Sequence, residues 1–299
     1  MNITIAIPTF KRADRLFKTL DSVNRVQAPN GTFIDILIVD NDVNRSAEKC
    51  VSIFSKESRF PITYFVENRR GLSHVRNRIL GEAMNLNADY LAGIDDDEIV
   101  PPDWLIELWN GMKRYGADIV GAPVEGVLPP DIPKWAMYAD VFKPYRTRQT
   151  GAVVSDIGTG NYLLDLRFIK RHNLKFSSAF NFIGGEDSDF FIRCTGHGAK
   201  VVWIREALAT ETIPLERIKL KWVIMRHYRI GHGMATTRPK NRSLGALRSL
   251  IKITYYLPLS AIYFALCNQK CGYRYFFRFF FHLGKLSAFY GFQPYPEYR

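Results

Sequence analysis

Residues 90–98 read YLAGIDDDE, an apolar run that ends in four consecutive carboxylates, Asp95 to Glu98. A short apolar run predicts a buried strand, and the carboxyl ends of such strands are where open α/β sheets bind their ligands. Adjacent carboxylates repel one another and raise one another's pKa, so a bound cation or ligand stabilises them. The stretch therefore indicates a ligand site, although a solvated acidic turn is the alternative for this motif alone.

The acidic stretch suits a hard divalent cation. Mg²⁺ and Mn²⁺ are commonly held by one or two carboxylates while substrate phosphates fill the other positions. We therefore expect Mn²⁺ or Mg²⁺ at this point of the chain and a nucleotide diphosphate beside it.

Apolar runs and helical spacings alternate along the first 120 residues. The expected strands cover 3–7, 34–39, 62–66, 90–94 and 119–120, and the expected helices cover 13–23, 47–54, 73–84 and a segment opened by Pro101-Pro102. This alternation favours an α/β fold with a mostly parallel sheet and helices on both faces. A loop-rich stretch, 124–154, reads as an elaboration around a substrate site.

Polar groups follow the first three strands in turn. They are Pro8-Thr9, Asp40-Asn41-Asp42 and Asn68-Arg69-Arg70-Gly71. An acid after a strand can accept hydrogen bonds from a base or a ribose, and arginines can neutralise a diphosphate. Each loop alone reads as well as a turn or a helix cap. With the acidic stretch, four such loops in order favour a nucleotide site.

A glycine pair, Gly184-Gly185, precedes two acids, Glu186 and Asp187, at the start of an expected helix. The glycines would allow close approach of a ligand, and the helix N-terminus would stabilise the carboxylates. The pattern is typical of a positioned catalytic base, with a helix-capping acid as the alternative.

The net charge of +12 is concentrated at one end of the 299-residue chain. Residues 1–214 hold 26 Lys and Arg against 27 Asp and Glu, whereas residues 215–299 hold 15 against 2. Of the 41 aromatic residues, 16 lie in 243–299. Basic and aromatic residues together suit an anionic membrane surface better than nucleic acid.

Two segments of this tail are expected to contact the membrane. Along residues 273–292, Arg274, Arg278 and Lys285 fall on a narrow arc of a helix and phenylalanines cover much of the rest. Residues 253–267 are uncharged but too short to span, which favours an interfacial segment. The alternative for the aromatic helix is a protein core or an oligomer contact.

Four cysteines are few for this length, and Cys267 and Cys271 lack the second Cys or His pair of a zinc site. The N-terminal residues lack a basic region and a long apolar run, so no signal peptide is expected. These features predict a reducing, cytoplasmic location.

Taken in order, these motifs resemble those of family 2 glycosyltransferases of the GT-A fold, and bacterial exopolysaccharide enzymes in particular. The resemblance runs through most of residues 3–233. It rests on Ile7-Pro8-Thr9-Phe10 with Arg15-Leu16, Val39-Asp40-Asn41, Asn68 to Asn77, the acidic stretch, Pro133-Lys134-Trp135, Gly160-Asn161 and Gly184 to Asp187.

The resemblance implies a role for each motif. Asp187 would be the catalytic base and Glu186 would orient the acceptor, while Asp97, with Asp95, would hold the metal. Asp40 would contact the nucleotide base and Asp95 the ribose side. The remaining residues expected around the nucleotide are Pro8, Thr9, Asn68, Gly71, Arg76 and Asp96.

Residues 226–233 gather two arginines, two histidines and two glycines. Arg226, Arg229 and His232 are candidates to bind the leaving diphosphate from a flexible lid, and the exposed end of a basic helix is the alternative. The chain lacks the Gln-x-x-Arg-Trp motif of processive synthases, so the resemblance favours transfer of a single sugar.

The sequence thus predicts a catalytic domain, 1–214, and a helical, membrane-associating tail, 215–299. The expected activity is metal-dependent, inverting transfer of one hexose from a nucleotide-diphosphate sugar, UDP-linked by expectation, to a lipid-linked or polysaccharide acceptor. The enzyme would be peripheral at the cytoplasmic face of the inner membrane and would not bind nucleic acid. A nucleotidyltransferase and a non-catalytic membrane adaptor are the alternatives. The sequence does not predict an oligomeric state.

Overall fold

The computed structural model describes residues 1–142, 148–181, 184–237 and 242–292. The described residues form two compact units. The first contains 1–125, 148–181 and 186–211, and the second contains 126–142, 184–185, 212–237 and 242–292. The sequence predicts a single boundary, after residue 214. In the structure the second unit contains 126–142 and 184–185 as well as the described residues from 212 onward.

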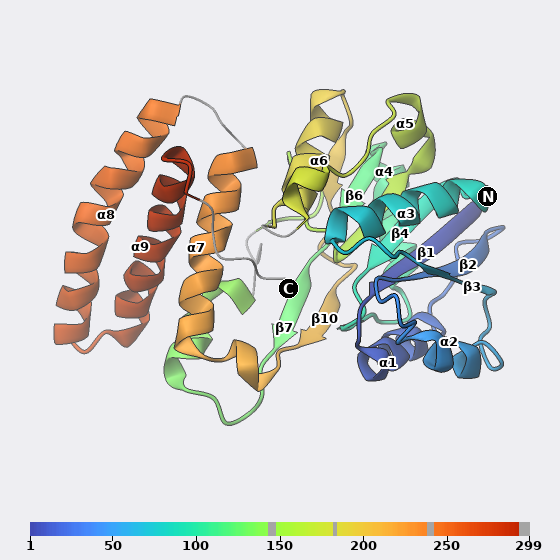
Figure 1. Ribbon diagram of the computed structural model, residues 1–299, viewed down its shortest axis with the longest axis horizontal. Coiled ribbons are helices and arrows are strands. Elements are labelled where there is room, and N and C mark those ends of the chain that lie inside the picture. Colours follow the sequence, from blue (N-terminus) through green and yellow to red (C-terminus); the bar gives the residue numbers. More distant parts are fainter. Residues whose placement is uncertain (143–147, 182–183, 238–241, 293–299) are drawn as a thin grey trace. The chain divides into compact units, whose positions relative to one another are not determined.

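The first unit is built on a mixed seven-stranded sheet (Figure 1). Its strands are β1 (Asn2–Thr9), β2 (Phe33–Asp40), β3 (Ile62–Val66), β4 (Tyr90–Ile94), β6 (Ile119–Gly121), β8 (Asn161–Asp165) and β9 (Val201–Trp203). Their order is β3-β2-β1-β4-β8-β6-β9. Strand β8 runs antiparallel to both of its neighbours, and the other described pairings are parallel. The predicted mostly parallel sheet is therefore confirmed.

Helices cover both faces of this sheet (Figure 1). One face carries α1 (Ala13–Val23), α2 (Glu48–Phe54) and α4 (Trp104–Tyr115), and the other carries α3 (Leu72–Asn85), α5 (Leu166–Arg171) and α6 (Glu186–Gly196). The strands alternate between the two cores, as the period of two requires. In β1, Ile3, Ile5 and Ile7 pack into the first core and Ala6 into the second.

The strand register aligns the loops that follow the strands. Thr9 pairs with Asp40, Asp40 pairs with Val66, and β4 lies on the other side of β1. A second sheet, of order β5-β10-β7, contains β5 (Glu98–Ile99), β10 (Ala209–Thr212) and β7 (Val124–Val127). The acidic stretch therefore spans the short turn between β4 and β5, and both of its ends are anchored in sheets.

The second unit consists mainly of three long helices, α7 (Leu220–Thr237), α8 (Arg242–Ala265) and α9 (Gln269–Phe289). Helix α9 packs against both α7 and α8 (Figure 1). Short 3-10 turns complete the unit: η1 (Lys134–Tyr138), η2 (Asp140–Phe142) and η4 (Leu215–Arg217), with η3 (Ser178–Phe180) lying in the first unit. Phe277 of α9 is buried in a core with Ala136, Phe142 and Val223.

Two sequence expectations for this unit change. The aromatic helix expected on a membrane surface is α9, which packs between α7 and α8, and its contact with a membrane stays a prediction. Residues 253–265 of the expected interfacial segment belong to α8. Residues 226–233, expected as a flexible lid or a helix end, lie inside α7, where Gly231 packs directly against the carbonyl oxygen of Phe281. No described helix is both long enough and apolar enough to cross a membrane.

Candidate functional site

The acidic turn alternates between buried and partly exposed carboxylates. Asp96 and Glu98 are buried, whereas Asp95 and Asp97 are partly exposed. Thr9 Oγ1 donates a hydrogen bond of 2.7 Å to Asp96 Oδ2, and the backbone N–H of Asp95 donates one of 3.0 Å to Glu98 Oε2. Asp96 and Glu98 therefore hold the turn in place, which leaves Asp95 and Asp97 as the carboxylates that a ligand can reach.

Burial makes the charge of this turn unfavourable. It raises the pKa of Asp96 to about 6, although the hydrogen bond from Thr9 opposes the shift. It also raises the pKa of Glu98 well above its usual range, with a further contribution from Asp95. The side chain of Asp95 is 36% exposed, yet the surrounding protein raises its pKa against the opposing effect of Arg76. A cation bound at this turn would relieve these repulsions.

Two arginines that were not among the predicted site residues contact the acidic turn. Arg12 Nη1 lies 2.9 Å from Asp97 Oδ2 and 3.3 Å from Asp96 Oδ1, and Arg15 Nη1 lies 3.2 Å from Asp97 Oδ2. Their spacing of three residues after the first strand places both arginines on one face of a helix start, although it does not indicate Asp97 as their partner.

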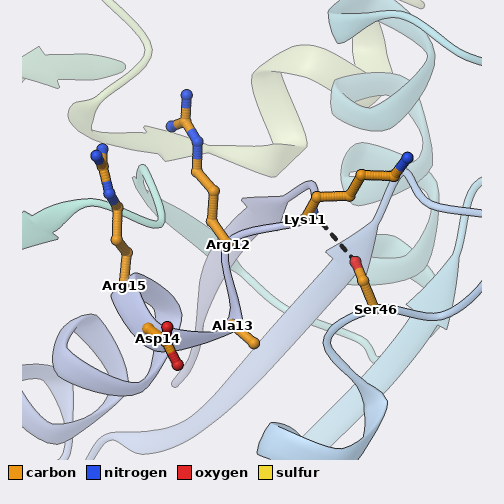
Figure 2. A pocket seen from close by; sticks show the side chains of 6 residues that line it. All are labelled: Lys11, Arg12, Ala13, Asp14, Arg15 and Ser46. Carbon is orange, nitrogen blue, oxygen red and sulfur yellow. Dashed lines mark hydrogen bonds between the residues drawn. The ribbon is translucent and has the colours of Figure 1, made fainter. Parts of the chain in front are cut away.

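Figure 2 shows the open pocket that these arginines line. Arg12 and Arg15 extend in the same direction, and Lys11 points away from them. The loop is held by the backbone N–H of Lys11, which donates to Ser46 Oγ at 3.1 Å. Lys11 has a left-handed φ of 54°, which is uncommon outside glycine. The chain is thus turned sharply where its basic side chains begin.

Arg76 connects the acidic turn to the start of α6. Its guanidinium is buried, 3.6 Å from Asp95 Oδ1 and 3.8 Å from Glu186 Oε1. Burial lowers the pKa of Arg76 while Asp95, Glu186 and Asp187 raise it, and the net shift is upward. Arg76 Nε has no hydrogen-bond partner among the described residues. One buried cation therefore compensates carboxylates from both motifs.

Helix α6 begins at Glu186, as the sequence predicted. Glu186 is buried, and burial together with Asp187 raises its pKa to about 7 against the opposing effect of Arg76. Asp187 is partly exposed, and its Oδ1 accepts a hydrogen bond of 2.7 Å from the backbone N–H of Ser188. Gly184 and Gly185 have φ of 76° and 95°, a region that favours glycine. Asp187 is thus fixed at a helix N-terminus beside the acids that contact Arg76.

Asp40 and Asn41 organise the neighbouring loops. The Asp40 carboxylate is fully buried and accepts hydrogen bonds from the backbone N–H groups of Asp42 and Ala47 and from the Tyr64 hydroxyl, each at 2.9 Å. Asn41 bonds to the backbone of Glu67, Arg69 and Gly71. The contact of Asp40 with a nucleotide base stays a prediction, because in this structure its oxygens bond within the chain.

The other predicted nucleotide contacts lie on this loop edge. Pro8 is the penultimate residue of β1 and Asn68 is exposed after β3. Gly71 has a φ of 132°, and a Cβ added there would lie 2.6 Å from the side chain of Asn181. By contrast, Arg226, Arg229 and His232 belong to α7 of the second unit. His232 is buried, and its Nε2 lies 2.9 Å from the carbonyl oxygen of Phe292.

Gly160 supports the acidic turn by leaving space for it. A Cβ added at Gly160 would collide with Glu98 Oε1, whereas nothing lies within 4 Å of a Cβ added at Gly158. We expect Gly160→Ala to lower the free energy of unfolding by about 1–3 kcal/mol, the usual range for overpacking. Urea unfolding would measure this, with Gly158→Ala as the matched control. Equal effects of the two substitutions would contradict the assigned contact.

The carboxylates fit a divalent ion that completes its coordination with substrate oxygens. Among the residues that the structure describes, no group of three or more His, Cys, Asp or Glu side chains could hold a metal by itself. Asp95 and Asp97 supply the hard oxygen donors that Mg²⁺ and Mn²⁺ prefer, and such ions are often bound through one or two carboxylates plus phosphates. In this structure Arg12 and Arg15 balance the charge of Asp97.

At the strand ends of this mostly parallel sheet, the acidic turn and the helix-start acid form an arrangement suited to a nucleotide-binding transferase. The family model described as Glycosyl transferase family 2 matches residues 4–176, and the chain belongs to this family. It is therefore a glycosyltransferase. It is 30% identical over 235 residues to the succinoglycan biosynthesis protein ExoM of Rhizobium meliloti (strain 1021), covering 78% of this chain and 74% of that protein.

Two solved structures illustrate the shared fold. S. aureus TarS 1–349 in complex with UDP is 12% identical with a TM-score of 0.56, covering 97% of this chain and 92% of that one. The mannosyltransferase PcManGT from Pyrobaculum calidifontis, in complex with GDP-Man and Mn²⁺, is 18% identical with a TM-score of 0.58, covering 80% of this chain and 64% of that one. The predicted GT-A fold is confirmed by this likeness.

Proposed function

We propose that this glycosyltransferase moves one hexose from a UDP-linked sugar to a lipid-linked saccharide during bacterial exopolysaccharide biosynthesis, at the cytoplasmic face of the inner membrane. The observation that carries the proposal is that the buried guanidinium of Arg76 contacts both Asp95, in the acidic turn, and Glu186, at the start of α6. The similarity to a succinoglycan biosynthesis protein and the fold shared with a UDP complex support it.

In the proposed reaction, Asp187 accepts the proton of the acceptor hydroxyl as that oxygen attacks the anomeric carbon of the donor. A new bond forms between the acceptor oxygen and the anomeric carbon while the bond to the diphosphate oxygen breaks, and the nucleoside diphosphate leaves with the electron pair. Attack from the face opposite the leaving group inverts the anomeric configuration. Glu186, held by Arg76, is suited to position the acceptor beside Asp187.

Asp97 and Asp95 would hold a Mn²⁺ or Mg²⁺ ion, which when bound would neutralise charge on the diphosphate. Arg12 and Arg15 contact Asp97 and lie where they can turn from that carboxylate to the phosphates. Arginine matches phosphate oxygens through two parallel hydrogen bonds. Metal and nucleotide are therefore expected to bind together, each strengthening the other.

Replacement of Asp97 by alanine is expected to abolish the Mn²⁺-dependent part of donor binding while the fold is kept. The remaining ligand, Asp95, provides too few oxygen donors for the ion. Isothermal titration with UDP-glucose, with and without Mn²⁺, measures the effect. Asp14→Ala is the matched control, because Asp14 lines the same pocket and points away from Arg12 and Arg15 (Figure 2). Unchanged Mn²⁺ dependence in Asp97→Ala would exclude this metal assignment.

The proposed function is tested by a thermal-shift screen of nucleotide sugars with and without Mn²⁺, followed by product analysis. A ligand that binds only the folded protein raises its melting temperature by mass action. Release of a nucleoside diphosphate from a nucleotide sugar supports glycosyl transfer, whereas release of pyrophosphate from a nucleoside triphosphate supplied with a sugar phosphate would indicate a nucleotidyltransferase. Failure to bind or hydrolyse any nucleotide sugar with any divalent metal would overturn the proposal and favour the membrane adaptor.

A further inference from the structure

The three long helices of the second unit differ in how much of their surface the other two cover. Gly231 of α7 packs against the carbonyl oxygen of Phe281, and Gly284 of α9 packs against that of Tyr228, so the two backbones meet without intervening side chains. On its other side α9 packs against α8. The phenylalanine-rich helix is therefore largely covered within the unit.

Helix α8 has an inverted distribution of polar and apolar side chains. Its three buried residues, Ser249, Tyr256 and Ser260, all carry hydroxyl groups and face α9. Ser260 Oγ donates to the carbonyl oxygen of Gly272 at 2.9 Å, and Ser249 Oγ lies 3.4 Å from His282 Nδ1. A helix packed only against its own protein in water normally turns its apolar side inward.

The outer side of α8 is correspondingly apolar. We define the α8 apolar face as the six aliphatic residues Leu244, Leu247, Leu250, Ile251, Leu257 and Ile262, which are between 41% and 53% exposed. Their spacings of 3, 4, 7 and 11 residues place them along one side of the helix. A contiguous apolar surface of this kind marks a site that another apolar body covers.

The charges near the α8 apolar face indicate what kind of surface binds to it. Between Glu216 and Glu297 the sequence contains no Asp or Glu. Basic residues stand along the same two helices, with Arg242, Arg248 and Lys252 on α8 and Arg274 and Arg278 on α9. A second copy of this chain would bring an equally basic surface to the contact, which is unfavourable. An anionic lipid bilayer supplies both the apolar interior and the negative headgroups.

We propose that the α8 apolar face is the surface by which this protein docks on anionic membranes, with α8 lying in the interface. Three basic residues and its polar, α9-facing side fit a helix that lies on a bilayer, and no described helix is suited to cross one. The inference places the membrane contact on α8, which contains most of the uncharged segment 253–267, rather than on α9. It deepens the proposed function, because a lipid-linked acceptor would be met at that surface.

The test is sedimentation of the full-length protein with phosphatidylcholine vesicles, with and without phosphatidylglycerol. The test variant is Leu247→Gln/Ile251→Gln/Ile262→Gln, which keeps charge and helix propensity. The control is Val43→Gln/Ile53→Gln/Leu215→Gln, which removes three similarly exposed apolar side chains that do not belong to α8. We expect the test variant to bind anionic vesicles roughly 10- to 100-fold more weakly, and the control to bind like the wild type.

Several outcomes would overturn the inference. They are wild-type binding that ignores phosphatidylglycerol, vesicle binding that survives in the test variant, and a wild type that binds no vesicles. In the last case, a wild-type dimer that the test variant converts to a monomer would assign the face to a second copy. Circular dichroism verifies that both variants fold. Hydrolysis of nucleotide sugars without membranes separates a failed docking surface from a failed proposed function.

Discussion

The variant Asp187→Asn is expected to turn over on the order of 10²–10⁴-fold more slowly than the wild type, the range usual for loss of a general base. Asparagine has nearly the same shape and can still accept the 2.7 Å hydrogen bond from the backbone of Ser188, so the helix start should be kept. It cannot accept the proton of an acceptor hydroxyl at neutral pH. Donor affinity should change little, because the substitution affects the transition state more than the bound donor.

The measurement compares kcat with the Kd for the nucleotide sugar in the same preparation. Asp189→Asn is the control, since Asp189 lies on the same helix and bonds to Arg193 at 2.7 Å. A large fall in kcat for Asp187→Asn alone supports its assignment as the base. Full turnover in this variant would move the assignment to Glu186, whose replacement by Gln should then have the larger effect.

The sheet and its helices could be predicted from the sequence because each strand and helix carries its own periodic signal. The expected strand over 90–94 and the helix start at Glu186 match the structure. The match follows from local physics, because the apolar period and the acids at a helix start act within a few residues. The acidic turn was found for the same reason, since its charges are adjacent in sequence.

Other features depend on which residues meet across the fold. The contacts of Arg12 and Arg15 with Asp97 join residues more than 80 positions apart, and nothing local indicates that partnership. The three-carboxylate environment of Arg76 is likewise a product of the fold. Such long-range pairings are fixed only when the strands take their order in the sheet.

In the second unit, too, the sequence alone does not show which helix surfaces are buried. The phenylalanines of α9 and the leucines of α8 are both apolar, and the sequence does not show which helix lies between two others. The position of α9 between the other two helices depends on two glycines, because Gly231 and Gly284 allow α7 and α9 to approach closely. The aromatic residues of α9 were therefore expected at the membrane, whereas in the structure Phe277 is buried, the other phenylalanines of α9 are partly buried, and aliphatic residues of α8 are exposed.

Replacement of Arg76 by methionine is expected to lower the free energy of unfolding by about 3–5 kcal/mol near pH 8, the range for removing one partner of a buried ion pair. Arg76 is buried, and its loss leaves Asp95 and Glu186 without their shared cation. The Glu186 carboxylate cannot move into water, since it is itself buried. The effect should therefore be much larger than that of Arg78→Met, because the Arg78 side chain is 38% exposed and pairs with Glu82 one turn along the same helix.

The loss of unfolding free energy in Arg76→Met should grow as the pH rises. Burial already raises the pKa of Asp95 and brings that of Glu186 to about 7, and removal of the cation raises both further. The folded variant then keeps protons that the unfolded chain has released. Its stability must fall as the pH rises from the unfolded values of about 4 through the folded ones. Near pH 5 Glu186 is largely protonated in the folded variant, so the deficit relative to the wild type shrinks.

Urea unfolding of the wild type, Arg76→Met and Arg78→Met at about pH 5 and pH 8 measures both the size and the sign. The double variant Arg76→Met/Glu186→Gln should regain part of the loss at the higher pH, because one of the uncompensated charges is gone. An equal deficit at the two pH values would mean that Arg76 acts only by filling space. In that case the acidic turn and the start of α6 would be joined by packing, and the electrostatic link between Asp95 and Glu186 would be wrong.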